Sequence, residues 1–295
     1  MVKKYGELYQ DTRRALLATE NAQDAGVLAR MLVCHYSGKN QADFLANREM
    51  YASEKIVTDV EEGLARLLRQ EPIAYILGQW EFYGLPLHVS PKVLIPRDDT
   101  CAVAELAIRQ ALFLKKDPRI LDLCCGSGAI GLAVASRVPD AKVTLADLSQ
   151  DALSVAKENT ALNKLTGRVR VISADALKPA SPFLGKFDLI VSNPPYITGE
   201  DMLTLPESVK DYEPHMALYG GEDGLDFYRS IAKNYAPALK AGGYLAFEFG
   251  EGQGDDVCRI LAENRYTILE RTRDYNDRER AVLAQYGRKE ENYGD

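Results

Sequence analysis

The most informative segment of the chain reads Ile120-Leu121-Asp122-Leu123-Cys124-Cys125-Gly126-Ser127-Gly128-Ala129-Ile130-Gly131. Its first four residues have the pattern of a buried strand, its middle is a glycine loop, and a helix is predicted from Ser127. Glycines in such a loop let a ligand approach the backbone closely. The segment therefore predicts a strand, a ligand-binding loop and a helix in direct succession.

Strand-like and helix-like segments alternate along the chain after about residue 94. Helices are expected from Ser127, from Ser149, after Leu225 and after Gln253. Such alternation predicts a parallel sheet covered by helices on both faces. The last strand should pair antiparallel at the end of the sheet, because the polar connection before it leaves no room for a helix. The strand candidates are RILDL, KVTLAD, RVRVIS, FDLIVS, YLAFEF, YTILERT and AVLAQY.

The chain before these segments has a different pattern. Roughly the first 70 residues show only the apolar spacing of helices. Asp24 and Ser53 precede two of the apolar runs, where an oxygen side chain can accept from unpaired helix amides. The segment WEFYGLPLHV then predicts a short hairpin, and the polar tail GRKEENYGD is expected to be disordered. We therefore expect a helical domain at 1–78, a hairpin linker at 79–93 and a sheet domain at 94–295.

Composition and charge limit the class of protein. The chain has 295 residues, of which 46% are apolar, enough for two domains with real cores. No apolar stretch approaches the roughly 20 residues of a membrane span, and the start is too polar for a signal peptide, so we expect a cytoplasmic protein. The five cysteines include no C-x-x-C pair, which fits a reducing compartment. A net charge of -7 disfavours nucleic acid as the substrate and suits a basic protein partner.

The other polar groups give weaker signals. No metal site is predicted, because the three histidines are scattered and no spacing brings them together with carboxylates on one helix face: His35, His88 and His215. A long acidic loop after Tyr196 is a candidate substrate lid. One group of arginines is expected to form a solvated edge, with contact to the substrate protein or RNA as the alternative: Arg265, Arg271, Arg273, Arg278 and Arg280.

An acid at the end of the next strand indicates the kind of ligand. Asp147 lies 19 positions after Gly128, where a carboxylate can accept from both hydroxyls of a ribose. The unit therefore holds an adenosine, although its G-x-G-x-x-G spacing also fits a dinucleotide. Asp122 before the loop, Asp175 after the third strand and the motif after the fourth favour S-adenosylmethionine, because a cationic sulfonium suits an acidic site.

The fourth strand of the expected sheet ends in Asn193-Pro194-Pro195-Tyr196. This loop should emerge beside the glycine loop, because ligands in such sheets bind beyond the carboxyl ends of the strands. The prolines remove two backbone donors, which leaves the Asn193 side-chain oxygen and the Pro194 carbonyl to accept both hydrogens of an NH2 group. Accepting both returns electron density to an amide or aromatic amine nitrogen and aligns it with a methyl donor. Tyr196 would stack on the flat target group or exclude water.

Other functions stay open on these residues alone. N-P-P-Y can be a rigid surface turn, and Asp122 can be a turn-forming acid at a strand end. N-P-P-Y also serves the amino groups of adenine or guanine in DNA or RNA, which would require base flipping and a basic groove. A nicotinamide-dependent oxidoreductase or a non-catalytic nucleotide-binding module would be distinguished by whether a dinucleotide, rather than S-adenosylmethionine, raises the melting temperature.

Further blocks of sequence extend the pattern beyond these two loops. They read PIAYILG and WEFYGL at 72–85, IPR at 95–97, ALYGGEDGLDFYR at 217–229 and EFGEGQ at 248–253. Together with N-P-P-Y, these blocks resemble the bacterial peptide chain release factor glutamine methyltransferase family over the whole chain.

The resemblance implies a fold, an activity and a set of contacts. The fold would be α/β, a class I S-adenosylmethionine-dependent methyltransferase with a Rossmann-like, seven-stranded sheet and an antiparallel last strand. The implied activity is methylation of the side-chain amide nitrogen of the glutamine in the Gly-Gly-Gln motif of class 1 release factors, which leaves S-adenosylhomocysteine. A ribosomal protein glutamine is a variant target, and the helical domain would help to grip the release factor.

The predicted site residues combine the residue analysis with this resemblance. Asn193, Pro194 and Tyr196 are the catalytic candidates, and the whole segment Asn193, Pro194, Pro195 and Tyr196 would bind the glutamine. The cofactor candidates are Asp122, Cys124, Cys125, Gly126, Ser127, Gly128, Asp147, Leu148, Asp175, Ala176 and Asn193.

Two segments depart from the family pattern. Cys124 and Cys125 stand where the family has Gly-Thr before Gly-Ser-Gly, and a cysteine has less backbone freedom than a glycine. Both are expected to be small buried spacers without a redox role. Arg97-Asp98-Asp99-Thr100-Cys101 replaces the usual R-P-E-T-E, so that Cys101 stands in place of the last acid and is not expected to take its role.

Overall fold

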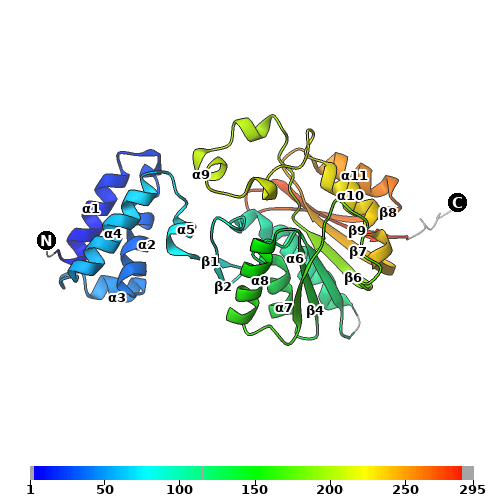
Figure 1. Ribbon diagram of the computed structural model, residues 1–295, viewed down its shortest axis with the longest axis horizontal. Helices are drawn as coiled ribbons and strands as arrows, with labels where there is room; N and C mark the ends of the chain where they lie inside the picture. The colour runs from blue at the N-terminus through cyan, green and yellow to red at the C-terminus, as the bar shows by residue number, and fades with distance from the viewer. Residues whose placement is uncertain (1–2, 115, 288–295) are drawn as a thin grey trace. The chain divides into compact units, whose positions relative to one another are not determined.

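The computed structural model describes residues 3–114 and 116–287. The chain forms two compact units (Figure 1). The smaller comprises 1–78 together with 207–212, and the larger comprises 79–206 and the chain from 213 onward. Within the described residues, no helix combines the length and the apolar character needed to cross a membrane. The expectation of a disordered tail concerns residues from 288 onward, which lie outside the described residues.

The smaller unit is the expected helical bundle. Leu32 of α2 and Val60 of α4 are fully buried in its two apolar clusters. A later segment joins this unit, because the Tyr212 hydroxyl donates a hydrogen bond to the Arg69 carbonyl over 2.6 Å. The helices are α1 (Tyr5–Leu16), α2 (Ala25–Ser37), α3 (Gln41–Ala46), α4 (Glu54–Leu67), α5 (Ile73–Leu77) and α9 (Glu207–Lys210).

The two expected helix caps differ in outcome. The Ser53 hydroxyl accepts from the Ile56 amide over 3.3 Å at the start of α4, as predicted. Asp24 stands before α2, but its side chain accepts no hydrogen bond from the helix. Its backbone, with φ at -100° and ψ at 5°, lies outside the extended region that a capping side chain needs, so this prediction was wrong.

The hairpin consists of β1 (Gln79–Phe82) and β2 (Leu85–His88), paired antiparallel. The two residues between these strands both have positive φ, 54° at Tyr83 and 77° at Gly84, which is typical of the tight hairpin turn whose twist matches the strands. The hairpin belongs to the larger unit. Asn159 of α8 (Gln150–Leu162) fixes it there, because its side chain accepts from the His88 amide over 2.6 Å and donates to the His88 carbonyl over 3.0 Å.

The larger unit is built on a sheet of seven strands in the order β5-β4-β3-β6-β7-β9-β8. The neighbours from β5 to β7 are parallel, as the alternation of strands and helices predicts. The strands are β3 (Arg119–Leu123), β4 (Lys142–Asp147), β5 (Val169–Ser173), β6 (Phe187–Ser192), β7 (Leu239–Glu248), β8 (Tyr266–Arg273) and β9 (Glu279–Tyr286).

The last strand is antiparallel, but it does not end the sheet. β9 pairs antiparallel with both β7 and β8, and β8 is the edge strand. The connection through α11 (Gly254–Glu263) carries the chain to β8, two positions from β7, and β9 then fills the place between. This inner position buries Val282 and Ala284 completely. The predicted direction is confirmed, and the predicted place at the end of the sheet was wrong.

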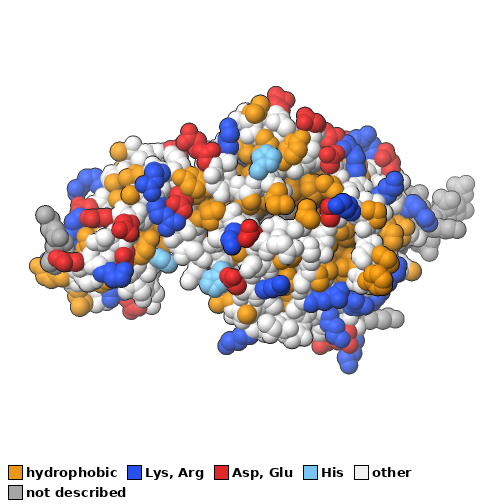
Figure 2. Space-filling view, viewed as in Figure 1, with side chains coloured by type: hydrophobic (Ala, Val, Ile, Leu, Met, Phe, Trp, Pro, Cys, Tyr) orange, Lys and Arg blue, Asp and Glu red, His pale blue; other side chains and the backbone are white. Residues whose placement is uncertain are grey.

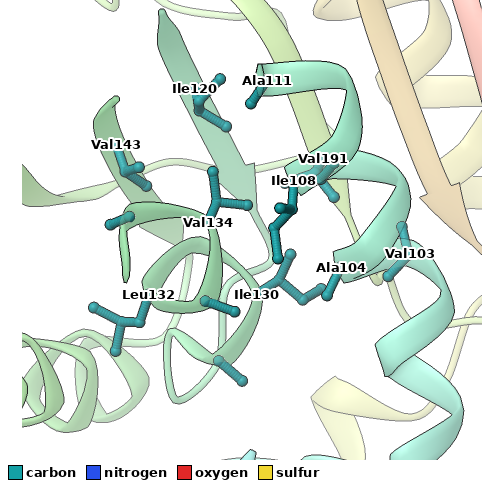
Figure 3. Packing of buried hydrophobic residues seen from close by; sticks show 14 of the residues in the cluster. Val103, Ala104, Ile108, Ala111, Ile120, Ile130, Leu132, Val134, Val143 and Val191 are labelled. Carbon is teal, nitrogen blue, oxygen red and sulfur yellow. The ribbon is translucent and has the colours of Figure 1, made fainter. Parts of the chain in front are cut away.

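Helices cover both faces of the sheet (Figure 1). Figure 3 shows Ile108 of α6 and Ile130 and Val134 of α7 gathered against Ile120 of β3 on one face. α10 and α11 pack on the other face around the buried Phe247 of β7. The helices are α6 (Cys101–Phe113), α7 (Ala129–Arg137), α8 (Gln150–Leu162), α10 (Asp226–Asn234) and α11 (Gly254–Glu263).

The closest packing in this core surrounds Gly131 in the first turn of α7. A Cβ atom there would lie 2.3 Å from a Leu145 methyl group and 2.9 Å from the Asp122 carboxylate. The same carboxylate accepts from the Gly131 amide over 2.7 Å. The helix can therefore approach β3 and β4 this closely only because residue 131 has no side chain.

We expect Gly131→Ala to lower the free energy of unfolding by about 2 to 3 kcal/mol, since overpacking outweighs the higher helix propensity of alanine. Gly167→Ala is the matched control, because a Cβ at Gly167 would meet no atom within 4 Å; we expect a change within about 0.5 kcal/mol. Urea denaturation of both variants measures the difference. Equal stability of the two would contradict the packing argument.

Candidate active site

A pocket lies at the carboxyl ends of β3, β4, β5 and β6. Ligands in open α/β sheets bind at this edge. The loop after each of the four strands contributes to the wall, and the segments around residues 92–100 and 214–217 close it from the side. The predicted residues among its lining are Cys124, Cys125, Gly126, Ser127, Asp147, Leu148, Asp175, Ala176, Asn193 and Pro195.

Asp147 is fixed at the pocket wall by two backbone amides. Its Oδ2 accepts from the Gly126 amide and its Oδ1 accepts from the Ser149 amide, each over 2.9 Å. Burial raises the pKa of the carboxyl, and the hydrogen bonds from Gly126 and Ser149 oppose that rise. Each oxygen keeps a further lone pair, so the held carboxylate can accept hydroxyl groups of a ligand.

Two predicted cofactor residues lie behind the wall and do not line it. Asp122 is fully buried in β3, where its Oδ2 accepts from the Gly131 amide and its Oδ1 has no partner among the described residues. Burial raises the pKa of this carboxyl to about 7 against the opposing hydrogen bond. Gly128 has a φ of 85° and precedes the first residue of α7. Both residues therefore shape the glycine loop from inside.

The two cysteines of the loop occupy different environments. Cys125 is buried, whereas Cys124 is partly exposed and has a φ of 61°, in the left-handed region that glycine adopts without strain. Cys124 is thus strained, at the position where the sequence resemblance implies a glycine. Burial raises the pKa of both thiols well above the usual value, so both stay protonated. This state fits the expected role as apolar spacers.

Asp175 and Ala176 form the wall after β5. The Asp175 Oδ1 accepts from the Leu177 amide over 2.9 Å, and Lys178 forms an ion pair with the same carboxylate at 3.1 Å. The buried Tyr235 of the segment after α10 donates its hydroxyl to the Asp175 carbonyl over 3.0 Å. The loop is therefore held from both sides. Leu148, after β4, presents a half-exposed apolar side chain to the pocket.

The N-P-P-Y segment leaves β6 directly beside the glycine loop. Asn193 and Pro195 line the pocket, whereas Pro194 and Tyr196 are not among its lining residues. Gln253 fixes the end of the segment, because its amide group donates to the Tyr196 carbonyl over 3.0 Å. Burial raises the pKa of the Tyr196 hydroxyl to about 12, so this side chain remains neutral.

Glu248 is a site residue that the sequence analysis did not single out. It ends β7, beside the end of β6, and is only 2% exposed. Burial raises the pKa of its carboxyl to about 7, while hydrogen bonding to Thr100 and Asn193 and the nearby Arg280 charge oppose the rise. An acid within the apolar strand YLAFEF, at the same sheet edge as the two loops, was the available signal.

This environment sets the orientation of the Asn193 amide. Its Nδ2 lies 3.4 Å from the Thr100 hydroxyl oxygen, to which it donates. The buried Glu248 carboxyl lies near enough for Asn193 to lower its pKa. The NH2 group thus faces Thr100, and the Oδ1 atom is left to accept from a ligand. Thr100, with Glu248 nearby, therefore favours the orientation of Asn193 that the predicted chemistry requires.

Arg280 departs from the solvated edge that was expected of the arginines near the carboxyl end of the chain. Arg280 is 6% exposed and forms ion pairs with Asp99 at 3.2 Å and Asp274 at 3.3 Å. Because Arg280 lies in β9, its ion pair with Asp99 links the segment 97–101 to this strand. Three of the other arginines, Arg271, Arg273 and Arg278, each form an ion pair with an acid.

A second ion pair supports the side wall of the pocket. Glu213 is buried, accepts from the Ile95 amide over 3.2 Å and pairs with the Arg97 guanidinium. Burial raises the pKa of the Glu213 carboxyl, and the Arg97 charge opposes that rise. Because Leu94 and Pro96 line the pocket on either side of Ile95, this contact holds the wall in place.

The chain matches known families over both of its parts. Residues 7–78 match the PrmC N-terminal domain, and residues 105–208 match the methyltransferase small domain. A release factor glutamine methyltransferase of Fusobacterium nucleatum is 41% identical over 256 residues, 86% of this chain and 71% of the relative. One of Clostridium acetobutylicum is 38% identical over 259 residues, 88% of this chain and 90% of the relative.

The chain belongs to the release factor glutamine methyltransferase family. The resemblance inferred from the sequence motifs is thereby confirmed. The fold also resembles that of a solved methyltransferase from Pyrococcus furiosus, with a TM-score of 0.52 and 18% identity over 77% of this chain and 100% of that chain. Membership of a methyltransferase family implies the use of S-adenosylmethionine in general.

Proposed function

We propose that the pocket binds S-adenosylmethionine and that the chain methylates the side-chain amide nitrogen of the glutamine in the Gly-Gly-Gln motif of class 1 peptide chain release factors. The observation that carries this proposal is the orientation of Asn193 at the pocket wall, whose NH2 group donates to the Thr100 hydroxyl. The names of the relatives supply the substrate class.

The residues of the pocket fit the proposed cofactor. Asp147 can accept from the two ribose hydroxyls, and the carboxylates of Asp147 and Asp175 suit a ligand with a sulfonium and an ammonium charge. Ile130, Leu148 and Phe227 give the wall an apolar part that suits a flat adenine ring. Asp122 acts from behind by holding the first turn of α7 through Gly131.

The N-P-P-Y segment would position the target nitrogen. S-adenosylmethionine supplies an electrophilic methyl group on a cationic sulfur. The Asn193 Oδ1 and the Pro194 carbonyl accept the two hydrogens of the glutamine NH2 group, which orients the nitrogen lone pair and increases its electron density. The nitrogen would bond to the methyl carbon as the sulfur–methyl bond breaks, which would leave neutral S-adenosylhomocysteine. It would then release one proton to solvent, so no strong base is needed. Tyr196 packs on the planar amide and excludes water.

The remaining parts of the proposal concern recognition and location. The domain at 1–78 helps to grip the release factor, the hairpin at 79–93 connects that domain along the chain to the rest of the larger unit, and 94–295 carries the chemistry. A net charge of -7 favours a basic protein surface as the partner and opposes nucleic acid as the methyl acceptor. The absence of a membrane-crossing helix among the described residues agrees with action in the cytoplasm.

We expect Asp147→Asn to weaken S-adenosylmethionine binding by about 10- to 100-fold, since it removes a charge-assisted acceptor and turns an NH2 group toward one of two backbone donors. Asp140→Asn changes the charge equally at an exposed position before the other end of β4 and should bind as wild type does. Isothermal titration calorimetry measures both. If Asp147→Asn bound S-adenosylmethionine with wild-type affinity, the ribose would have to bind at another position.

We expect Asn193→Ala to lower the rate of methyl transfer to purified release factor by at least about 100-fold, because one of two preorganised acceptors is lost. Transfer from labelled S-adenosylmethionine provides the measurement, and release factor with Gln→Ala in its Gly-Gly-Gln motif is the substrate control. Label on release factor that carries the Gln→Ala change would contradict the assigned glutamine. Undiminished label with the Asn193→Ala enzyme would contradict the role of Asn193. If release factor stays unlabelled while the enzyme binds the cofactor, ribosomal proteins and nucleic acids become the next candidate substrates.

Glu248 gives a pH-dependent prediction. Its pKa of about 7 means that the carboxylate, which accepts from Asn193, forms as the pH rises through neutrality, so kcat/KM should rise over the same interval. The folded pKa is raised above the usual 4.5, so the ionised form is disfavoured in the fold and stability should fall between about pH 4.5 and 7.

Glu248→Gln should flatten the rise of kcat/KM and lower its upper limit, because the amide does not titrate. The decline of stability with pH should become smaller without vanishing, since Asp122 has a similarly raised pKa of about 7. Rates and urea denaturation across this pH range test both effects. An unchanged activity profile in Glu248→Gln would exclude Glu248 as the group that positions Asn193.

A further inference from the structure

A second hollow lies at the opposite edge of the sheet from the proposed cofactor pocket. It opens at the amino ends of β3, β4 and β5 and has a volume of about 440 Å³. Four cationic side chains line it, and no Asp or Glu does among the described residues: Arg119, Lys142, Arg168 and Arg170. We call this hollow the basic groove.

The sheet register places three of these cations, Arg119, Lys142 and Arg170, on one face. Arg119 is paired with Lys142, and Arg170 with Thr144, which lies two positions after Lys142 and so on the same face of β4. Adjacent strands are about 4.8 Å apart. The cations therefore spread across three strands over roughly 10 Å, a spacing that suits several anionic groups in a row.

The charges of the basic groove are not neutralised within the chain. None of its four cations forms an ion pair with an acid of the described residues. Arg170 donates to the Thr144 hydroxyl over 2.8 Å and to the Leu184 carbonyl over 3.0 Å, and Arg168 donates to the Val138 carbonyl over 3.2 Å. These neutral acceptors fix the guanidinium groups and leave their charges available. On the drawn face, Lys and Arg side chains gather along the lower margin of the larger unit, beneath β4 and β6 (Figures 1 and 2).

An exposed aromatic residue lies on the segment that contacts these cations. Phe183 is 95% exposed, and it directly precedes Leu184, which binds Arg170. A Cβ atom at Gly185, one residue further, would lie 2.9 Å from the Arg119 guanidinium. The segment that carries Phe183 is therefore in contact with two arginines of the groove. A phenylalanine this exposed gains nothing from the core of the chain itself.

We propose that the basic groove binds single-stranded RNA, with the phosphates along the four cations and a base stacked on Phe183. Unneutralised cations beside an exposed aromatic ring are the combination by which proteins hold single strands without reading their sequence. An acidic peptide would match the charges but would offer no flat base to Phe183. The RNA is a ligand here and not the methyl acceptor, since the groove and the proposed cofactor pocket lie at opposite ends of the same strands.

The test measures binding of a fluorescein-labelled oligoadenylate RNA of about ten nucleotides, a length typical of single-strand sites. Anisotropy titrations of the full chain at several salt concentrations give the affinity and the salt dependence. The variant is Lys142→Glu with Phe183→Ala, two exposed positions whose side chains make no contact needed for the fold. The control is Lys157→Glu with Phe113→Ala, which changes the charge equally and removes an aromatic ring that is 81% exposed.

The proposal expects saturable binding that weakens with salt, at least a tenfold loss in the variant with a shallower salt slope, and less than a twofold change in the control. Binding should persist in Asn193→Ala, which separates the result from the methyl transfer assay. The proposal would be overturned by an absence of saturable binding, by equal losses in variant and control, or by competition from polyglutamate as effective as that from RNA. Displacement of RNA by inorganic triphosphate alone, with no loss from Phe183→Ala, would reduce the site to a phosphate site and overturn the RNA assignment.

Discussion

The parallel pairing of β3 with β6 is the constraint on which the site depends. It sets Leu123 opposite Ser192, and the Ser192 hydroxyl donates to the Leu123 carbonyl over 2.6 Å. The glycine loop and the N-P-P-Y segment begin at the residues immediately after this pair. A slip of one position would turn every side chain of one strand to the opposite face, so the cores on both faces fix the distance between cofactor and target loops.

Two buried acids show what this arrangement costs. Asp122 and Glu248 lie in the sheet with their pKa values raised to about 7 by burial, and each leaves one oxygen without a partner among the described residues. A buried acid with an unused acceptor destabilises a fold, so its presence indicates another role. Here each acid orients a loop, Asp122 through the Gly131 amide and Glu248 through the Asn193 side chain. Stability is given up at the places where loop geometry matters for the site.

The sequence alone was enough to predict those features whose signals are local. The glycine loop, N-P-P-Y and the alternation of strands and helices each depend on neighbouring residues, and the fold inferred from them is confirmed. The place of β9 depends on pairing with β7 and β8, which no local pattern encodes. α6 was not predicted because it is apolar on almost every side and shows little helical period. Glu248 and Arg280 gain their roles only from strands that meet in the folded sheet.

Cys124 shows how far such tertiary contacts can override a local preference. Its φ of 61° costs a non-glycine residue about 1 to 2 kcal/mol. On either side, the Cys125 amide donates to the Ala146 carbonyl over 3.0 Å and the Gly126 amide donates to Asp147 over 2.9 Å. Two such hydrogen bonds are worth roughly as much as the strain. The loop shape is therefore imposed by β4 and not by the residue at position 124, which explains how the chain keeps this loop with a cysteine there.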